Sequence, residues 1–306
     1  MQSVSVLGAG ALGLLYASHW AKAGVKVELL LRADQISRFA QGIGCQDQPR
    51  LAVTLRSLDA PGAPISHLLL ATKATQAASA LTPWLVHLSD DAQLLMIQNG
   101  LGSQQQVAAL LKPTQTLLAA SVTEGAYRSS ADPALVVHAG RGETRLGVWS
   151  GAQAISGVET WVGSLQQAGL SASAVTDILP VLWEKLLIND LINPLTAWHQ
   201  VPNGELLRRD LETQWLALLD ELGPLLPWLP LSAPAKGWPA RIREVLTATA
   251  ANQSSMWQDR LAGRPTEVDF IILPLLEAAQ QRGLSLPRHQ ALWQAIRQGE
   301  WPPPAD

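Results

Sequence analysis

Three polar side chains recur at four-residue intervals in an otherwise apolar stretch of the chain. Lys185, Asn189 and Asn193 occur within Leu182–Leu195, and Pro194 follows the last of them. Residues four apart share one face of a helix, so this spacing would group an ammonium with two amides. An ammonium can stabilise negative charge on a substrate oxygen and donate a proton to it. An ordinary amphipathic helix with a surface lysine has the same spacing, and spacing alone leaves both interpretations open.

Two further polar segments lie later in the chain. Asn252 and Ser255 are three apart and would share a helix face, as they also would on the polar side of a solvent-facing helix. Thr266 and Asp269 resemble a capping box, in which Glu267 would favour the helix dipole in the first turn. The capping interpretation explains Asp269 well and Glu267 only in part.

A glycine-rich loop near the N-terminus has the composition of a dinucleotide-binding turn. The pattern G-x-G-x-x-G is matched by Gly8, Ala9, Gly10, Ala11, Leu12 and Gly13. The loop follows an apolar strand pattern and opens a helical one, which is the context that the mechanism requires. The glycines allow a tight turn, a close approach of the backbone to a pyrophosphate and close helix–strand packing. The helix N-terminus would then face the phosphates.

The end of the second predicted strand indicates which nicotinamide cofactor is used. Glu28 could be the acid that binds the ribose 2′-hydroxyl of NAD, but the apolar run continues for three residues beyond it, to Leu31. At the end of the run stands Arg32, whose guanidinium suits a 2′-phosphate. We therefore expect NADPH rather than NADH, although Arg32 could also be a solvated surface charge.

Two more strand patterns end in polar residues. The run His67–Ala71 leads into Lys73, and Leu94–Gln98 leads into Asn99. The ligand crevice of an open α/β sheet lies beyond the carboxyl ends of its strands. We therefore expect Lys73 and Asn99 to join Arg32 and the glycine loop at that edge, although a surface lysine and a plain Asn-Gly turn remain alternatives.

The elements that would position these residues change in kind along the chain. Strand patterns occupy the first part, at Val4–Leu7, Val25–Leu31, His67–Ala71, Leu94–Gln98, Leu117–Val122, Ala134–His138, Thr144–Val148 and Leu170–Val175. Helical patterns separate several of them, at Ala11–Ala23, Gln76–Leu88 and Val158–Ala168. This alternation predicts βαβ units and a parallel sheet, with some of the later strands antiparallel.

Helical patterns dominate after about residue 176. They cover Ile178–Leu191, Leu206–Leu222, Ala240–Ala262 and Val268–Arg282, with a proline-rich gap at Pro224–Pro239. Pro194 should end or kink the helix that carries Asn193. The sequence therefore predicts an α/β Rossmann-type domain over residues 1–176 and an all-helical domain over residues 177–306.

Composition excludes several classes of protein. The chain has 306 residues, a formal net charge of −3 and no long run of Lys or Arg, so we expect no nucleic-acid partner. The single cysteine, Cys45, cannot form an internal disulfide, and no Cys/His cluster has metal-ligand spacing, so no metal is expected. The apolar start lacks a preceding basic residue, and no run of eighteen apolar residues occurs, so we expect no signal peptide and no membrane span. A reducing cytoplasm is the simplest compartment.

Several of these segments, in order from residue 1 to about residue 290, resemble the ketopantoate reductase (2-dehydropantoate 2-reductase) family. The most specific are the block from Lys185 to Leu195 and the Ser-Ser-Met-x-Gln-Asp block at Ser254–Asp259. Less specific segments that also match are Gly8–Gly13, Leu31-Arg32, Lys73, Gln98–Gly100, Pro202–Leu206 and Thr266–Asp269.

The resemblance implies a function and a role for each candidate residue. The family reduces 2-dehydropantoate to pantoate with NADPH, in pantothenate and coenzyme A biosynthesis, and its helical domain is like the C-terminal domain of 6-phosphogluconate dehydrogenase. By resemblance Lys185 and Glu267 are catalytic, and Glu267 would keep Lys185 charged, so that the lysine needs no depressed pKa. The implied substrate contacts are Asn189, Asn193, Asn203, Asn252 and Ser255, and the implied cofactor contacts are Gly8–Gly13, Arg32, Lys73 and Asn99.

One departure from the family pattern concerns the substrate. The family commonly has Asn-Gly shortly after the Thr-Glu-x-Asp segment, where this chain has Ile272-Leu273. The main expectation is ketopantoate reduction, by a monomer or a homodimer. Two alternatives remain: an NADP-dependent reductase of another 2-oxo or 3-hydroxy acid, and a non-catalytic NADP(H)-binding protein. The retained lysine and amides argue against the latter, since a sensor needs no proton donor.

Overall fold

The computed structural model describes residues 1–46, 48–151, 155–232 and 234–301. The contacts within the chain divide it into two compact units. Unit 1 consists of Met1–Gln98 with Ser103–Ile178, and unit 2 consists of Asn99–Gly102 with the chain from Leu179 onward. The predicted combination of an α/β domain with an all-helical domain is confirmed.

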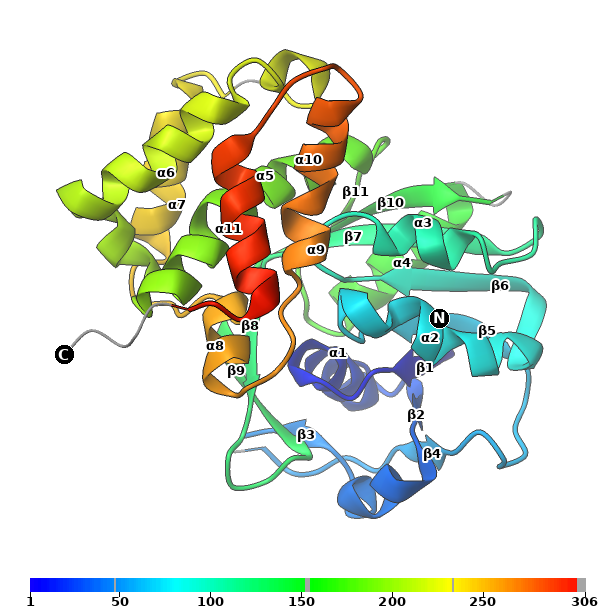
Figure 1. The fold of residues 1–306 in the computed structure, drawn as a ribbon. Coiled ribbons are helices and arrows are strands. Elements are labelled where there is room, and N and C mark those ends of the chain that lie inside the picture. Colours follow the sequence, from blue (N-terminus) through cyan, green and yellow to red (C-terminus); the bar gives the residue numbers. More distant parts are fainter. Residues whose placement is uncertain (47, 152–154, 233, 302–306) are drawn as a thin grey trace. The chain divides into compact units, whose positions relative to one another are not determined.

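Unit 1 is built on an eight-stranded sheet with the order β11-β10-β7-β6-β5-β1-β2-β4 (Figure 1). Six neighbouring strands run parallel, β10 is antiparallel to β7, and β11 is parallel to β10. The strands are β1 (Ser3–Leu7), β2 (Lys26–Leu30), β4 (Thr54–Arg56), β5 (Ile65–Leu70), β6 (Leu88–Met96), β7 (Thr116–Val122), β10 (Thr144–Ser150) and β11 (Ala172–Ala174). The parallel series thus brings six consecutive carboxyl ends to one edge, those of β4, β2, β1, β5, β6 and β7.

A second, three-stranded sheet in unit 1 has the order β3-β9-β8. Its strands are β3 (Gly44–Cys45), β8 (Gly125–Arg128) and β9 (Leu135–Gly140). The run Ala134–His138, which the sequence analysis placed among the later strands of a single sheet, therefore belongs to a separate sheet.

Helices cover both faces of the large sheet. They are α1 (Ala11–Lys22), α2 (Ala77–Leu81), α3 (Ser103–Ala108) and α4 (Ile155–Gln167), with 3₁₀ helices η1 (Ala33–Phe39), η2 (Ala74–Gln76) and η3 (Thr82–His87). One apolar core contains the buried side chains of α1 and α4, and a second contains those of α2, α3 and η3. Alternate residues of the strands contribute to each core, as the two-residue period of a strand requires.

The predicted helix Gln76–Leu88 is wrong in extent. The α-helix ends at Leu81, and the chain continues as the 3₁₀ helix η3, which has Pro83 at its start. Proline has no N–H group to donate to the carbonyl four residues earlier, which disfavours continuation of the α-helix at this point.

Unit 2 is helical throughout its regular structure. Its helices are α5 (Leu179–His199), α6 (Arg209–Leu222), α7 (Gly237–Ala248), α8 (Ser255–Leu261), α9 (Val268–Ile271), α10 (Leu273–Gln280) and α11 (Pro287–Gln298), with 3₁₀ helices η4 (Asn203–Leu207) and η5 (Leu226–Trp228). Helix α5 packs against α6, α8, α9, α11 and η4. It is therefore the central element of unit 2.

Helix α5 continues past Pro194 for a further five residues, to His199, instead of ending near Leu191. Pro194 removes the donor for the carbonyl of Asp190. The hydroxyl of Thr196 donates to the carbonyls of Ile192 (2.8 Å) and Asn193 (3.1 Å) in the same turn. Burial of nearly every residue from Asp190 to Ala197 outweighs the cost of the proline.

Two predicted long helices are each divided in the structure. The span Ala240–Ala262 is interrupted between α7 and α8, where the carbonyls of Ala250 and Asn252 accept N–H groups from Gly204 and Asn203 instead of continuing a helix. The span Val268–Arg282 is interrupted at Ile272, because Pro274 has no N–H to donate to the carbonyl of Phe270. That carbonyl accepts the N–H of Leu101 at 2.9 Å, which attaches Asn99–Gly102 to α9.

Among the described residues, no helix is long and apolar enough to cross a membrane.

Candidate functional site

The glycine loop joins β1 to α1 in a conformation that its glycines make possible. Gly8 has φ +114°, and a Cβ atom there would lie 2.5 Å from the backbone of Ala71 and Thr72. A Cβ atom at Gly13 would overlap the carbonyl oxygen of Gly8, so this glycine permits close packing of α1 on the loop. At Gly10 the nearest heavy atom would be 3.9 Å away, which leaves open space where a ligand backbone could approach. The geometry fits a dinucleotide loop.

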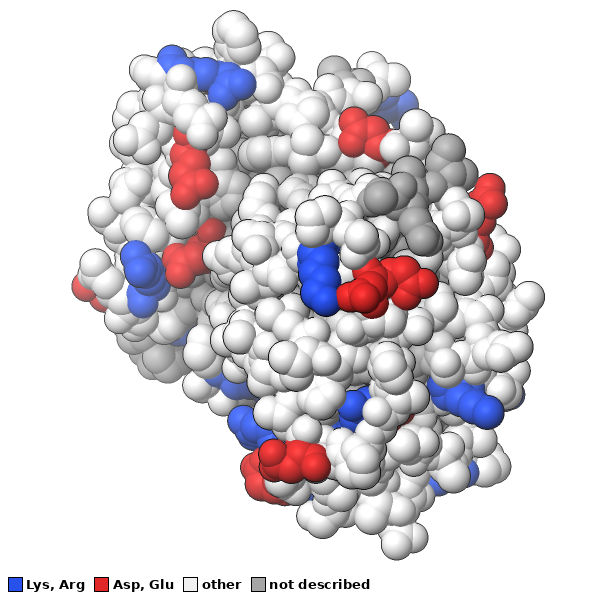
Figure 2. Space-filling view, turned by 90° about the vertical axis from the view of Figure 1, so that its right-hand side faces the viewer, with Lys and Arg blue, Asp and Glu red and all other residues white. Residues whose placement is uncertain are grey.

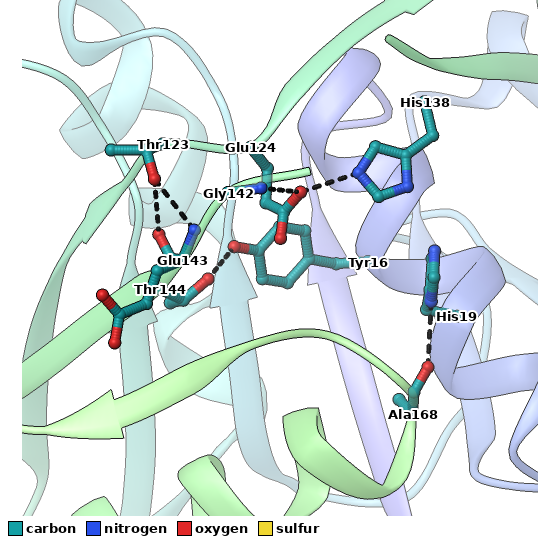
Figure 3. A network of polar contacts seen from close by, with 9 residues as sticks. All are labelled: Tyr16, His19, Thr123, Glu124, His138, Gly142, Glu143, Thr144 and Ala168. Carbon is teal, nitrogen blue, oxygen red and sulfur yellow. Dashed lines mark hydrogen bonds and ion pairs between the residues drawn. The ribbon is translucent and has the colours of Figure 1, made fainter. Parts of the chain in front are cut away.

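Helix α1 is anchored behind this loop by a polar network (Figure 3). The hydroxyls of Tyr16 and Thr144 share a short hydrogen bond, and the Nδ1–H of His19 donates to the carbonyl of Ala168 at 2.9 Å. Beside them the buried carboxylate of Glu124 lies 2.7 Å from Nε2 of His138 and accepts the N–H of a loop glycine. Burial raises the pKa of Tyr16 far above its usual range, so its hydroxyl stays neutral. The network fixes the direction in which the N-terminus of α1 points.

Arg32 and Glu28, the two candidates for recognising the cofactor ribose, have different environments. Arg32 follows β2 by two residues and its side chain is exposed, with a surface ion pair to Asp34 at 3.4 Å. Glu28 lies within β2 on the face that η3 covers. It accepts the hydroxyl of Ser5 at 2.9 Å and lies 3.6 Å from the buried guanidinium of Arg56. The ion pair occupies Glu28, and Arg32 is the side chain that remains accessible.

Lys73 and Asn99 follow the carboxyl ends of β5 and β6, as expected, but they belong to different units. Lys73 precedes η2 in unit 1, whereas Asn99 begins the segment that groups with unit 2. Thr72 and Gln98 immediately precede Lys73 and Asn99 in the chain. Their buried atoms Thr72 Oγ1 and Gln98 Oε1 have no hydrogen-bond partner among the described residues. Such buried unsatisfied atoms are uncommon, and a bound ligand is one way to satisfy them.

In unit 2 the candidate catalytic lysine stands on a helix face with two amides. Lys185, Asn189 and Asn193 occupy successive turns of α5, and Lys185 and Asn189 are half-buried. Burial lowers the pKa of Lys185 to about 8, while the negative charge of Glu267 acts in the opposite direction. A lysine that acts as an acid needs no such depression, but burial disfavours the charge of Lys185 more than one carboxylate favours it.

Glu267 does not belong to a capping box. It is itself the N-cap residue of α9, without a side-chain cap hydrogen bond, and its side chain is buried. Asp269 is instead engaged by α11, where Nε1 of Trp293 donates to its carboxylate at 2.8 Å. The capping interpretation of Thr266 and Asp269 is therefore wrong. A buried carboxylate that acts electrostatically on Lys185 fits the catalytic interpretation of Glu267 better.

The remaining predicted substrate contacts lie around the loop between α7 and α8. Asn203 is buried, its amide donates to the hydroxyl of Thr249 at 3.0 Å, and its N–H donates to the carbonyl of Asn252 at 3.0 Å. Its Oδ1 is buried without a partner in the described part of the chain. The side chain of Asn252 is exposed, and Ser255 is the half-buried first residue of α8. The structure thus brings Asn203 and Asn252 into direct contact.

Ser254, the residue before Ser255, has a structural role that the sequence analysis missed. Its hydroxyl oxygen accepts the N–H of Trp257, which caps α8, and the same hydroxyl shares a hydrogen bond of 2.8 Å with the hydroxyl of Thr196 on α5. The start of α8 is thereby tied to the turn of α5 that holds Asn193. Serine is a favoured N-cap residue, and this preference could have identified Ser254 as the cap.

A buried charged cluster beside α5 was also missed. Nε2 of His289 on α11 lies 3.0 Å from Asp190 of α5, and its Nδ1 lies 2.6 Å from Glu221 of α6. Burial alone would lower the pKa of His289, but the two carboxylates outweigh it and raise this pKa to about 8. The three residues are far apart in sequence, and no local pattern connects them.

Ile272 and Leu273, which replace the Asn-Gly pair common in the family, have packing roles in unit 2. Ile272 is fully buried in an apolar cluster with Met256, Val268 and Ile296, and Leu273 starts α10. These contacts give the departure a role in the core of unit 2.

The charged side chains do not gather into one large patch on the face shown in Figure 2. On the face shown in Figure 2, Lys/Arg and Asp/Glu side chains lie in small groups separated by uncharged residues. Within the described ranges, no group of three His, Cys, Asp or Glu side chains could hold a metal ion.

Comparison with known proteins covers both units. Residues 4–151 match the family model "Ketopantoate reductase PanE/ApbA", and residues 177–300 match its C-terminal counterpart. The 2-dehydropantoate 2-reductase of Vibrio cholerae serotype O1 is 34% identical over 310 residues, covering 96% of this chain and 97% of the relative.

Two solved structures extend the comparison to the fold. A PanE/ApbA family ketopantoate reductase from Ralstonia eutropha JMP134 has a TM-score of 0.83 at 25% identity, with 97% of each chain covered. A D-mandelate dehydrogenase with NADH and anilino(oxo)acetate has a TM-score of 0.85 at 18% identity, covering 97% of this chain and 98% of the other, and shows the fold alone.

Proposed function

Because the chain belongs to the ketopantoate reductase family, we propose that it catalyses the reduction of 2-dehydropantoate to pantoate with NADPH. The observation that supports the proposal most strongly is the pairing of Lys185 with Glu267. A half-buried amine whose pKa is lowered to about 8, on one helix face with two amides and under the influence of a buried carboxylate, is suited to proton transfer near neutral pH.

The residues of this chain would divide the reaction between them. Bound NADPH supplies a hydride to the ketone carbon of the substrate. Lys185, charged below pH 8, stabilises the negative charge that develops on the ketone oxygen and donates its proton there. Glu267 favours the charged form of the lysine. Asn189, Asn193, Asn203, Asn252 and Ser255 offer neutral hydrogen-bonding groups for the hydroxyl and carboxylate of the substrate.

The cofactor assignment rests on unit 1. The open approach at Gly10 and the N-terminus of α1 suit a pyrophosphate, and Lys73 and Asn99 are the polar residues that follow the next two strands. NADPH is favoured over NADH because Glu28 is engaged by Arg56, while the exposed guanidinium of Arg32 can meet a 2′-phosphate.

The test is the loss of NADPH absorbance with ketopantoate, repeated with NADH and with a panel of other 2-oxo acids. Candidate 3-hydroxy acids are assayed in the opposite direction, by the gain of NADPH absorbance when they are oxidised by NADP+. We expect the highest kcat/KM with ketopantoate and NADPH. A higher kcat/KM for another acid would replace the substrate but keep the chemistry. NADPH binding without turnover of any member of the panel would refute the proposed enzyme activity.

A further inference from the structure

One short backbone segment underlies the whole glycine loop. All three glycines of the motif approach Ala71–Thr72, which follows β5 and is called the loop floor here. A Cβ atom at Gly8 would lie 2.5 Å from both floor residues, one at Gly13 would lie 3.1 Å from Cβ of Ala71, and one at Gly10 would lie 3.9 Å from the carbonyl oxygen of Ala71. A shift of the floor would therefore move the loop.

A buried side chain just after the neighbouring strand β6 holds both ends of the loop floor, whose Ala71 N–H also donates to the carbonyl of Leu7 at 2.8 Å. The amide Nε2 of Gln98 donates to the carbonyl of Leu70 at 2.8 Å and to the carbonyl of Thr72 at 3.1 Å. These carbonyls stand immediately before and at the end of the floor. Gln98 is 5% exposed, so water cannot easily replace either hydrogen bond.

We propose that Gln98 is the positioning residue of the cofactor site, which holds the loop floor so that the glycine loop and Lys73 meet the cofactor phosphates. The proposal rests on the proposed use of a nicotinamide dinucleotide. Gln98 does not touch the cofactor in this proposal but acts through the backbone of residues 70–72. Both hydrogens of its amide are used on the floor, and its Oε1 has no partner among the described residues.

The orientation of the amide gives the proposal a specific chemical signature. Only the NH₂ group can face the two carbonyl oxygens, because Oε1 would repel them. A glutamate at this position has nearly the same shape but would present a carboxylate oxygen to the carbonyls. Once protonated, the acid can donate one hydrogen bond and restore part of the contact.

The first test compares Gln98→Met with wild type in binding NADPH, measured by fluorescence titration without substrate. Methionine fills similar volume but donates no hydrogen bond. We expect Kd for NADPH to rise about tenfold or more, while kcat at saturating NADPH and ketopantoate stays within about threefold.

A matched control is available at the opposite ends of the strands. Gln115 is also buried, and its Nε2 donates to the carbonyl of Ser89 at 2.9 Å, just before β7. Gln115→Met should lower the melting temperature about as much as Gln98→Met but leave the Kd for NADPH unchanged. Equal Kd values for Gln98→Met and wild type, or equal rises in both variants, would overturn the positioning role.

The second test uses Gln98→Glu. If Gln98→Met is too unstable to titrate, this variant by itself tests the positioning role of Gln98. We expect the affinity of this variant for NADPH, relative to wild type at the same pH, to improve as pH falls and the new carboxyl takes up a proton. A constant ratio across pH would overturn the proposal. Both tests measure NADPH binding, so they can be interpreted even if the protein does not reduce ketopantoate. If wild type binds no nicotinamide dinucleotide, the proposed function and the positioning role of Gln98 both fail.

Discussion

The two units present their candidate binding groups in different ways. In unit 1 the groups come from strand ends and loop backbone. The backbone conformation of the loop requires glycine at positions such as Gly8, where φ is +114°. In unit 2 the groups are side chains on helix faces. Their chemistry depends on their charge state, since burial lowers the pKa of Lys185 to about 8. A backbone site depends on sterics and position, whereas a side-chain site depends on the electrostatics of each group. Substitutions should therefore act mainly on affinity in unit 1 and on rate and pH dependence in unit 2.

The largest effect should come from Lys185→Ala. Removal of the ammonium takes away both the proton donor and the stabilisation of the developing charge, so we expect kcat/KM with ketopantoate to fall about a thousandfold, or about 4 kcal/mol of barrier. Binding of NADPH should be unchanged. Lys236→Ala, at an exposed lysine before α7, is the matched control and should retain full activity. Turnover of Lys185→Ala within tenfold of wild type would show that the role is assigned wrongly.

The next effect concerns stability. The pKa of His289 is raised from 6.5 to about 8 in the folded chain, so its charged form favours folding. The contribution is complete below pH 6.5 and is lost as pH rises through 8; it amounts to about 2 kcal/mol. Thermal melts of wild type should therefore show a falling melting temperature over this range, and His289→Gln should lack that dependence. A parallel decline in both proteins would contradict the assignment.

A smaller effect is expected at the surface of unit 1. Arg32→Ala should raise KM for NADPH about tenfold, about 1.4 kcal/mol, because one exposed guanidinium contact to a 2′-phosphate is lost. KM for NADH should not change. Arg38→Ala, at an exposed arginine in the 3₁₀ helix η1 that Arg32 precedes, serves as control. Equal rises of KM for both cofactors would indicate a general disturbance of the loop instead of recognition of the phosphate.

The smallest effect is a displacement along the pH axis. The reduction requires protonated Lys185, so kcat should fall as pH rises through about 8. Glu267 raises the pKa of Lys185, so Glu267→Gln should move this limb to lower pH. Rate profiles of kcat against pH, compared by shape and not by height, measure the displacement. A limb that stays in place would mean that Glu267 does not set the charge of the lysine.

The sequence alone allowed much of unit 1 to be predicted, because its signals are local. The glycine pattern, the apolar strands and the polar residues after them predicted the sheet and the edge where Gly8, Arg32 and Lys73 lie. The separate sheet of β3, β9 and β8 was not predicted, since pairing of short strands depends on distant partners.

Unit 2 was less accessible from the residues themselves. Helical periodicity found most of its helices, but hydrogen bonds from Asn203 and Gly204 accompany the break between α7 and α8, and such distant partners leave no trace in periodicity. The break at Ile272 follows from Pro274, which the sequence does show. The pairing of Lys185 with Glu267 was expected only through family resemblance. The Asp190–His289–Glu221 cluster joins three helices. It could not be predicted because its members are far apart in the sequence.

The ion pair between Glu28 and Arg56 has a practical consequence for redesign. Glu28 stands twenty residues after Gly8, so a motif search would select it as an NAD determinant and as the obvious residue to alter when coenzyme preference is to be switched. Its replacement would instead remove the carboxylate that pairs with the guanidinium of Arg56, whose side chain is only 3% exposed. A buried charge without its counter-charge is destabilising. An engineer who wants an NADH-dependent variant should leave position 28 untouched and work outward from the solvent-facing turn at positions 32–34.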